Sequence, residues 1–410
     1  MKGRNLILCL DGTWNSTFSL EKKADGSGIV KPSNVLKLSR ALTNTTEDGR
    51  QQVVYYTSGV GSTGSFDGVS NWLLKKVDNF LGGAFGAGLE TKAQSALTFL
   101  SNNYQPTDHL SIFGFSRGAA TARVVCNILS WMAVGTHPNG AILKKDDAYY
   151  LPHLIREYFK CEGKRSFIEV TKKSDTNKSF NHFSGEVLPL EIDLLGVWDT
   201  VLSIGSRLKP KNAPHLNNTK LPNAVKVALH ALATDEKRSD FSPSIWKETE
   251  NHQKLQQRWF AGVHANIGGG YPNDGLANCA LDWFVSEAKM HGLEFRDEYL
   301  NYYRAYADDT LYDSKSFFYK MADKLRSSNG TRQMSQIDHS ATVDYSLIIR
   351  MLGDLNYKPQ NAIDFLNNLY INDPLALYNL LRSQIAGRSV KNSDRITPKN
   401  IEGLFKKSLN

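Results

Sequence analysis

The sequence predicts an α/β protein in which a mainly parallel central sheet is flanked by helices. Short apolar runs, such as residues 5–10 and 109–113, alternate with stretches whose apolar residues recur at helical spacing. Polar or glycine-rich turns follow several of these runs directly. One such turn, between an apolar run and a helical stretch, is a Gly-x-Ser-x-Gly pentapeptide. These three observations indicate parallel strands with loops that gather at their carboxyl ends.

The composition is that of a globular chain. It has 410 residues, of which 41% are hydrophobic and 10% aromatic. No apolar run approaches the ~20 residues that span a bilayer. The apolar start is interrupted by Asp11 and lacks a small-residue cleavage site, so we expect a core strand and no cleaved signal peptide. The four cysteines are widely spaced, which disfavours a zinc site or disulfide framework and favours a reducing, cytoplasmic compartment.

The net charge of +8 predicts attraction to polyanions. The basic residues are scattered in pairs, and no dense basic tract with interleaved aromatic residues occurs. A nucleic-acid partner is therefore not expected. An anionic membrane surface is compatible with the same charge.

The periodicity of apolar residues predicts the elements in chain order. We expect strands at residues 5–10, 52–56, 109–113, 188–198 and 258–263, and helices at residues 34–42, 91–103, 119–134, 149–159, 224–233 and 276–290. Ser33 is expected to cap the first helix. Residues 1–295 then form a catalytic α/β domain. Residues 296–410 form a helical region that packs on this domain or acts as a cap.

Two segments of the predicted catalytic domain do not fit the regular alternation of strands and helices. Residues 66–90 interleave large apolar side chains with glycines, which suits a mobile lid over an acyl-chain pocket. An amphipathic helix followed by a glycine-rich loop explains the same pattern. Residues 135–185 are expected to form an insertion, of which the polar stretch at residues 172–181 is exposed.

The pentapeptide Gly114-Phe115-Ser116-Arg117-Gly118 lies between a predicted strand and a predicted helix, as in the nucleophile elbow of an α/β-hydrolase. The sharp turn favours glycine at both flanks, and Ser116 occupies its tip. The amide of Arg117 and the positive end of the helix face the same place. A second oxyanion donor is expected at Gly12 or Thr13, after the first strand. The alternative there is a turn held by the Asp11 side chain.

Ser116, Asp199 and His264 each follow a predicted strand, in the chain order of the α/β-hydrolase triad. A serine hydroxyl needs a base to take its proton, and an imidazole suits this exchange at neutral pH. Asp199 would orient the imidazole of His264 and stabilise its charged form. We therefore expect Ser116 as nucleophile, His264 as base and Asp199 as orienting acid, with no metal or cofactor.

Other residues compete for these roles. His230 and His339 are alternative bases among the ten histidines. Asp274 is the main rival of Asp199, and Asp193 is expected to be a paired, buried acid. Three alternative functions remain. They are a metal-dependent phosphoester hydrolase with Asp11, Asp199 and His264 as ligands, an esterase acting on a soluble ester, and a non-catalytic binding protein.

The chain also resembles a known family, the uncharacterised α/β-hydrolase domain family that includes the first class of type VI secretion lipase effectors. The matching motifs run in order along residues 5 to about 290. They are Asp11-Gly-Thr-Trp-Asn15, Gly59-Val-Gly61, Gly114-Phe-Ser-Arg-Gly-Ala119, Gly196-Val-Trp-Asp-Thr200, His230-Ala-Leu-Ala with Asp235-Glu236, Phe241-Ser-Pro243, Gly262-Val-His264 and Gly268-Gly-Gly-Tyr271.

The resemblance implies a lipid ester hydrolase, a phospholipase A, whose triad carries over to Ser116, Asp199 and His264. It further implies a phospholipid or other lipid ester as substrate, and an immunity protein or a secretion component as partner. It also implies delivery from the producing cell to a target cell. One position departs from the family, because Asn266 stands where an acid is common. An asparagine there replaces the hydrogen bond of the acid but not its charge.

Overall fold

Among the residues that the computed structural model describes, seven parallel strands form the central sheet, in the order β11-β10-β9-β8-β5-β1-β4. The strands are β1 (Asn5–Leu10), β4 (Gln52–Thr57), β5 (His109–Phe115), β8 (Ile192–Trp198), β9 (Val225–Ala233), β10 (Lys254–Phe260) and β11 (Ala341–Val343). The structure describes residues 3–12, 20–22, 28–30, 32–58, 84–174, 182–201, 219–238, 241–314, 332–334, 341–388 and 390–406. The predicted α/β class with a mainly parallel sheet is confirmed.

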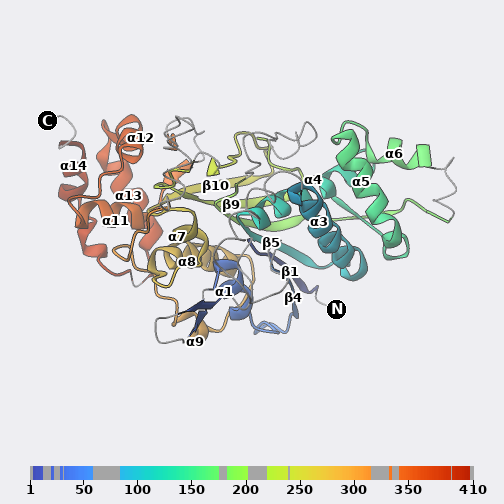
Figure 1. Ribbon diagram of the computed structural model, residues 1–410, viewed down its shortest axis with the longest axis horizontal. Coiled ribbons are helices and arrows are strands. Elements are labelled where there is room, and N and C mark those ends of the chain that lie inside the picture. The colour runs from blue at the N-terminus through green and yellow to red at the C-terminus, as the bar shows by residue number, and fades with distance from the viewer. Residues whose placement is uncertain are drawn as a thin grey trace.

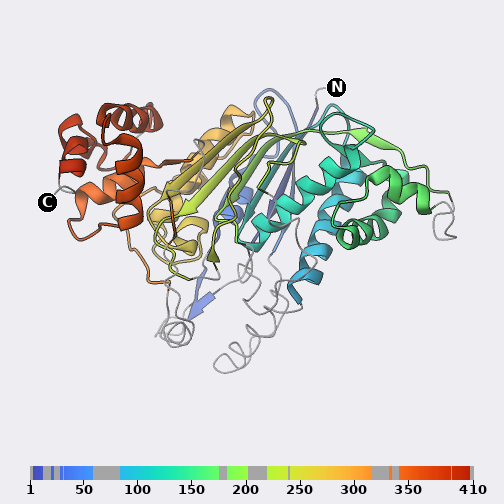
Figure 2. The same ribbon diagram turned by 90° about the horizontal axis from the view of Figure 1, so that it is seen from above.

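Two layers of helices cover the sheet, because alternate side chains of a strand point to opposite faces (Figures 1 and 2). One layer holds α3 (Ala84–Asn103), α4 (Arg117–Ala133), α5 (Leu151–Cys161) and α6 (Phe167–Ser174). The other holds α1 (Asn34–Ala41), α7 (His264–Gly268), α8 (Gly275–Met290) and α9 (Asp297–Leu300). In β1, Leu6 and Leu8 pack with the first layer, and Ile7 and Cys9 with the second. As predicted, the Ser33 hydroxyl caps α1, accepting from the amide of Leu36.

The C-terminal helices gather beside the β11 edge of the sheet (Figures 1 and 2). They are α11 (Tyr345–Gly353), α12 (Gln360–Tyr370), α13 (Pro374–Ile385) and α14 (Pro398–Lys406), with a short 3-10 helix, η5 (Ser393–Arg395). Their apolar residues form one cluster with Trp259 of β10 and Leu276 of α8. The region also contributes β11, a strand too short to show an alternating pattern in sequence. The domain boundary at residue 295 stays a prediction.

The prediction of a helix at residues 224–233 is wrong, because this segment is strand β9. β9 lies between β8 and β10 and is covered on both faces. A strand buried on both faces loses its alternation of apolar and polar residues and reads as a continuous apolar run. Such a run has no period that separates it from a buried helix.

The predicted lid falls mostly outside the described residues, and only residues 84–90 are seen, at the start of α3. The predicted insertion, residues 135–185, contains η1 (Lys145–Tyr150), α5, α6 and the first strand of a two-stranded sheet, β6 (Ala141–Leu143) with β7 (Val187–Pro189). A second small sheet pairs β2 (Leu20–Lys22) with β3 (Gly28–Val30). The predicted strand at residues 188–198 is thus divided between β7 and β8.

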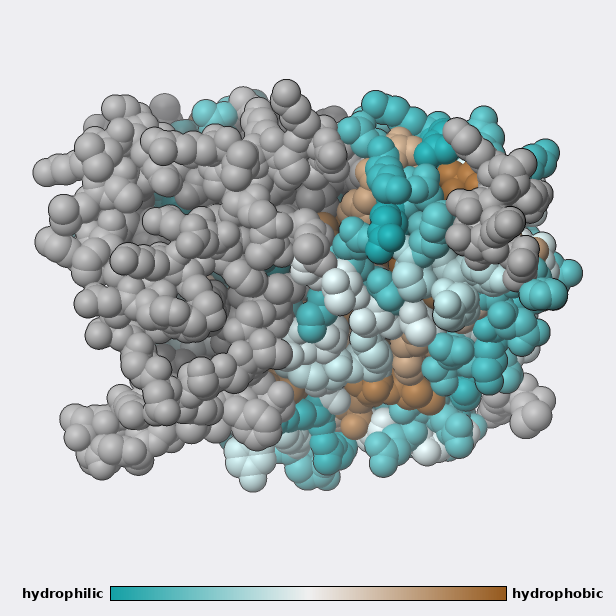
Figure 3. Space-filling model, turned by 45° about the vertical axis from the view of Figure 1, so that its right-hand side comes forward, coloured by the Kyte–Doolittle hydropathy of each residue, from teal (hydrophilic) through white to brown (hydrophobic). Residues whose placement is uncertain are grey.

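The surface of the described residues is mostly hydrophilic on the face drawn in Figure 3, and hydrophobic residues there form small groups. Within the described ranges, no helix combines the length and the apolar character that a membrane crossing requires.

Helix α4 crosses the end of β1 so closely that only glycine fits at Gly118. A Cβ atom there would lie 2.0 Å from the carbonyl oxygen of Leu10. We expect Gly118→Ala to lower the free energy of unfolding by at least ~1–3 kcal/mol, the usual cost of overpacking, in urea titrations. Gly403→Ala in α14 is the control, because a Cβ atom there meets nothing within 4 Å. Equal stabilities of the two variants would contradict this packing.

Candidate active site

Ser116 lies at a strained turn between β5 and α4. Its φ of 56° and ψ of −121° place a non-glycine residue in a region that L-residues rarely occupy. Its amide donates to the carbonyl of Trp198 (3.1 Å), and its carbonyl accepts from the amide of Ala120 (3.1 Å). The hydroxyl does not cap α4. Backbone hydrogen bonds therefore hold Ser116 at the N-terminus of α4, and its hydroxyl is not used to cap the helix.

The turn needs glycine on both sides of Ser116. A Cβ atom on Gly114 would lie 2.7 Å from the carbonyl oxygen of Gly118. A Cβ atom on Gly118 would clash with the carbonyl oxygen of Leu10 at the end of β1. Larger residues would push α4 away from the end of the sheet.

His264 and Asp199 form a hydrogen bond of 2.7 Å between Nδ1 and Oδ2. Asp199 follows β8 directly, has a φ of 41° and is fully buried. His264 begins α7, shortly after β10. The amide of Ala233, at the end of β9, donates to Oδ1 of Asp199 (3.0 Å). The ends of three neighbouring strands thus build this pair.

The aromatic ring of Phe115 brings the serine turn and the histidine together. Its centroid lies 4.7 Å from that of the His264 ring. A Cβ atom on Gly268, in α7, would lie only 1.9 Å from Phe115 Cε2. Because Phe115 directly precedes Ser116, the elbow packs against the histidine helix. Phe241 covers another part of the imidazole, at 4.9 Å between centroids.

Burial and charge shape the protonation of the pair. Burial lowers the pKa of His264, although the hydrogen bond to Asp199 acts in the opposite direction. Burial would raise the pKa of Asp199, but the charge of Arg332 and the bond to His264 hold it well below its usual range. The site therefore favours a neutral imidazole beside an ionised carboxylate.

Arg332 is a partner of Asp199 that the sequence did not indicate. Its Nη1 donates to Oδ1 (2.6 Å) and its Nη2 to Oδ2 (3.0 Å) of Asp199. The residue lies far downstream of the motifs that contain Ser116, Asp199 and His264, in a stretch without recognisable periodicity. No local signal marks it.

Glu236 supports the histidine from its backbone side. Its Oε2 accepts from the amide of His264 (3.2 Å), and Arg238 binds the same carboxylate. Burial opposes ionisation, but Arg238 lowers the pKa of Glu236 to about 2. Its neighbour Asp235 accepts from the amide of Gly262 (2.7 Å) and from the hydroxyl of Tyr357 (2.7 Å). The motif Asp235-Glu236 thus anchors the histidine loop.

The competing residues lie elsewhere or have other partners. His230 is fully buried, accepts from the amide of Thr200 (3.3 Å), and burial lowers its pKa to about 3. Asp274 pairs with Lys37 Nζ (2.6 Å). His339 lies outside the described residues. Among the described residues, neither His230 nor Asp274 forms a hydrogen bond with His264 or Ser116.

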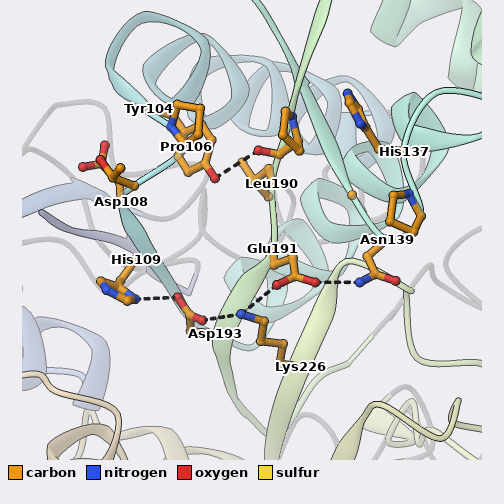
Figure 4. Close-up of a pocket in the computed structure, with 14 residues that line it drawn as sticks. Tyr104, Pro106, Asp108, His109, His137, Asn139, Leu190, Glu191, Asp193 and Lys226 are labelled. Atoms are coloured by element: carbon orange, nitrogen blue, oxygen red, sulfur yellow. Dashed lines mark hydrogen bonds and ion pairs between the residues drawn. The ribbon is translucent and has the colours of Figure 1, made fainter. Parts of the chain in front are cut away.

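Asp193 lies at the opposite edge of the sheet, beside a cavity of about 310 Å³ at the amino ends of the strands (Figure 4). It pairs with Lys226 (3.0 Å) and with His109 (3.4 Å), so the predicted pairing is confirmed, but the prediction that it is buried is wrong, because its side chain is 21% exposed beside the cavity. A second cavity, of about 500 Å³, lies on the histidine side of the molecule. Its lining includes Glu236 and Val263, together with the start of α12.

The turn after β1 is held by Asp11. Its carboxylate accepts from the amide of Gly12 (2.6 Å), the hydroxyl of Ser33 (2.6 Å) and the hydroxyl of Tyr56 (2.8 Å). The Gly12 amide is thus engaged, in line with the alternative of a turn held by Asp11. Thr13 lies outside the described residues.

Both the oxygen and the nitrogen of the Asn266 side-chain amide form hydrogen bonds. Its Oδ1 accepts from the amides of Val263 (3.3 Å) and Tyr312 (3.4 Å), and its Nδ2 donates to the carbonyl of Thr310 (3.2 Å). A carboxylate cannot make the last bond and would face the carbonyl oxygen. The residue is 1% exposed, so the change cannot be relieved by water.

We therefore expect Asn266→Asp to lower the free energy of unfolding by ~1–3 kcal/mol, the cost of a lost buried hydrogen bond. The dipole of the short helix α7 favours an acid by no more than ~1 kcal/mol and does not reverse this sign. Asn273→Asp is a matched control, because exposed Asn273 donates to the Thr310 hydroxyl, which can turn and donate instead. A stability of Asn266→Asp equal to that of the control would contradict this role.

Comparison with known proteins places these features in a family. The family described as "T6SS, Phospholipase effector Tle1-like, catalytic domain" matches residues 4–287. An uncharacterised protein of Saccharomyces cerevisiae is 29% identical over 243 residues, which are 58% of this chain and 32% of that protein. This chain therefore spans about a third of that relative's length.

Two solved structures are similar to this chain at 19% identity. The crystal structure of an uncharacterised protein from Pseudomonas aeruginosa covers 98% of this chain and 62% of its own length, with a TM-score of 0.40. The structure of the Tle1 effector bound to the VgrG spike from the type 6 secretion system covers 66% of this chain and 52% of its own length, with a TM-score of 0.34. Because the family match runs from β1 into α8 and includes well over half of the chain, the protein belongs to the Tle1-like phospholipase effector family, of which it carries the catalytic domain.

Proposed function

We propose that the protein is a serine hydrolase that cleaves carboxylic esters of phospholipids, as a phospholipase A, with Ser116 as nucleophile, His264 as base and Asp199 as orienting acid. The observation that carries this proposal is the 2.7 Å bond between His264 and the buried Asp199, next to a serine in a strained elbow. The family to which the chain belongs is described by the same substrate class.

The chemistry follows from the groups present. Neutral His264 takes the proton of the Ser116 hydroxyl through Nε2 as Oγ attacks the ester carbonyl carbon. The tetrahedral intermediate collapses when His264 returns this proton to the leaving alkoxide, which leaves an acyl group on Ser116. Water then attacks the acyl-enzyme by the reverse sequence. The carboxylate of Asp199 holds Nδ1–H and stabilises the imidazolium in each half-reaction.

The oxyanion of each intermediate needs donors beside Ser116. The amide of Arg117 opens α4, where the helix dipole favours negative charge. A Cβ atom on Gly12 would lie 3.2 Å from Cβ of Ser116, so the turn after β1 lies directly beside the nucleophile. Because the amide of Gly12 already donates to Asp11, Thr13 is the better second donor of this turn.

The family description also supports an assignment as an effector of a type VI secretion system. The partners of such an effector would be a secretion component and an immunity protein. The net charge of +8 suits a substrate held in an anionic membrane surface. A metal-dependent phosphoesterase is less well supported, because the guanidinium of Arg332 already occupies both carboxylate oxygens of Asp199.

Labelling with a fluorophosphonate probe tests the nucleophile. We expect wild type to be labelled and Ser116→Ala to be inert, because the probe reacts only with an activated serine. Ser95→Ala, which changes an exposed serine on α3, should label like wild type. Phospholipid vesicles should then yield fatty acid and lysophospholipid with wild type alone. Release of diacylglycerol or phosphatidic acid, or activity that a chelator abolishes and Ser116→Ala retains, would refute the proposal.

The buried histidine sets the pH dependence. Because burial lowers the pKa of His264, the imidazole stays neutral, and therefore active as a base, at more acidic pH than an exposed histidine. Activity is lost as the pH falls through the lowered pKa. We expect the acid limb of kcat/KM for a soluble ester to lie below the ordinary histidine pKa of ~6.5. An acid limb at or above that value would argue against His264 as the base.

A further inference from the structure

The guanidinium of Arg332 is the one feature of the described site that the triad chemistry leaves unexplained. Its side chain is 3% exposed and binds both oxygens of Asp199. Nη1 also donates to the carbonyl of Ala233 (2.9 Å) and Nη2 to that of Phe241 (2.5 Å). The guanidinium is therefore held in one orientation by Asp199, by the end of β9 and by the loop that follows β9.

The C-terminal region holds Arg332 in place. Asn361, in α12, donates through Nδ2 to the carbonyl of Arg332 (3.1 Å) and to that of Thr234 (3.0 Å). One amide group thus joins the C-terminal helices, the arginine and the loop after β9. The contact brings Arg332 and Asn361, which lie C-terminal to the family match at residues 4–287, into the proposed active site.

We propose that Arg332 is a positioning residue that locks the Asp199 carboxylate with Oδ2 toward His264 and offsets its charge, so that the C-terminal region completes the catalytic site. This inference rests on the proposed function. The geometry supports it because Oδ1 is taken by Arg332 and the Ala233 amide, which leaves Oδ2 as the oxygen that meets both the imidazole and Nη2. A carboxylate whose two oxygens both accept hydrogen bonds from one guanidinium cannot rotate away from the histidine.

The charge around His264 is balanced among the described groups. The carboxylates of Asp199 and Glu236 face it from the ends of β8 and β9, and the guanidiniums of Arg332 and Arg238 accompany them. Phe115 and Phe241 enclose the ring without charge. Loss of Arg332 would leave the imidazole in a net negative environment that favours its protonated form.

The test uses the full chain with Arg332→Met, Arg332→Lys and the control Arg388→Met. Arg388 also ties the C-terminal region to the rest of the protein through an aspartate, Asp282 on α8 (3.2 Å), but lies outside the catalytic contacts. The readouts are fluorophosphonate labelling rate, the pH profile of kcat/KM on a soluble ester, and the titration of His264 by NMR with labelled histidine, assigned with His264→Gln.

For Arg332→Met we expect the labelling rate to fall about tenfold to a hundredfold, as for a small misplacement of a reacting group. We also expect the His264 titration and the acid limb to move up by about one pH unit, since one neighbouring positive charge is lost. Arg332→Lys should keep the titration near that of wild type but label more slowly, because an ammonium cannot grip both oxygens. Arg388→Met should leave both readouts unchanged.

An unshifted His264 titration in Arg332→Met would overturn the inference, whatever the rate, because a merely structural arginine lowers activity without changing this equilibrium. If Arg332→Met does not fold, Arg332→Lys decides, and a wild-type labelling rate in that variant overturns the inference. Absence of labelling in wild type would instead refute the proposed function, and the NMR titration would still report on Arg332.

Discussion

The buried carboxylate of Asp199 is the constraint on which the site depends. An unpaired carboxylate in a protein interior costs several kcal/mol, so it persists only where donors surround it. Here His264, Arg332 and the amide of Ala233 all donate to it. The same bonds fix the end of β9, the start of α7 and the approach of the C-terminal region. Stabilising one charge therefore aligns segments that are distant in sequence.

The parallel sheet separates two kinds of acid on a single strand. Asp193 lies near the amino end of β8, where Lys226 and His109 pair with it. Asp199 follows the carboxyl end of the same strand, where the loops converge and a histidine meets it. Because every strand of the sheet points the same way, the turns that carry Ser116, Asp199 and His264 emerge at one edge. Strand direction distinguishes the acid that can serve catalysis from the acid that stabilises the fold.

Errors of the sequence-based prediction occur where local pattern and tertiary environment disagree. The segment that contains His230 lacks polar alternation because helices cover both faces of β9, and it was predicted to be helical. The three residues of β11 are too few to carry any period, yet they extend the sheet into the C-terminal region. The elbow was predictable from its local glycine-serine-glycine pattern, although only Gly114 is constrained by atoms of the same turn, whereas Gly118 is constrained by Leu10 at the end of β1.

The sequence by itself determined the α/β class, the elbow at Ser116, and the order in which an acid and a histidine follow later strands. Those features are local: a residue type next to a turn, or a period within one element. Only the tertiary structure decided that Arg332 grips Asp199, that Asn361 holds Arg332, and that the Gly12 amide is engaged by Asp11. The first two are contacts between residues far apart in the chain, and the third depends on how a side chain turns. The first two contacts leave no periodic or compositional signal, because they arise only when the sheet and the C-terminal helices have packed together.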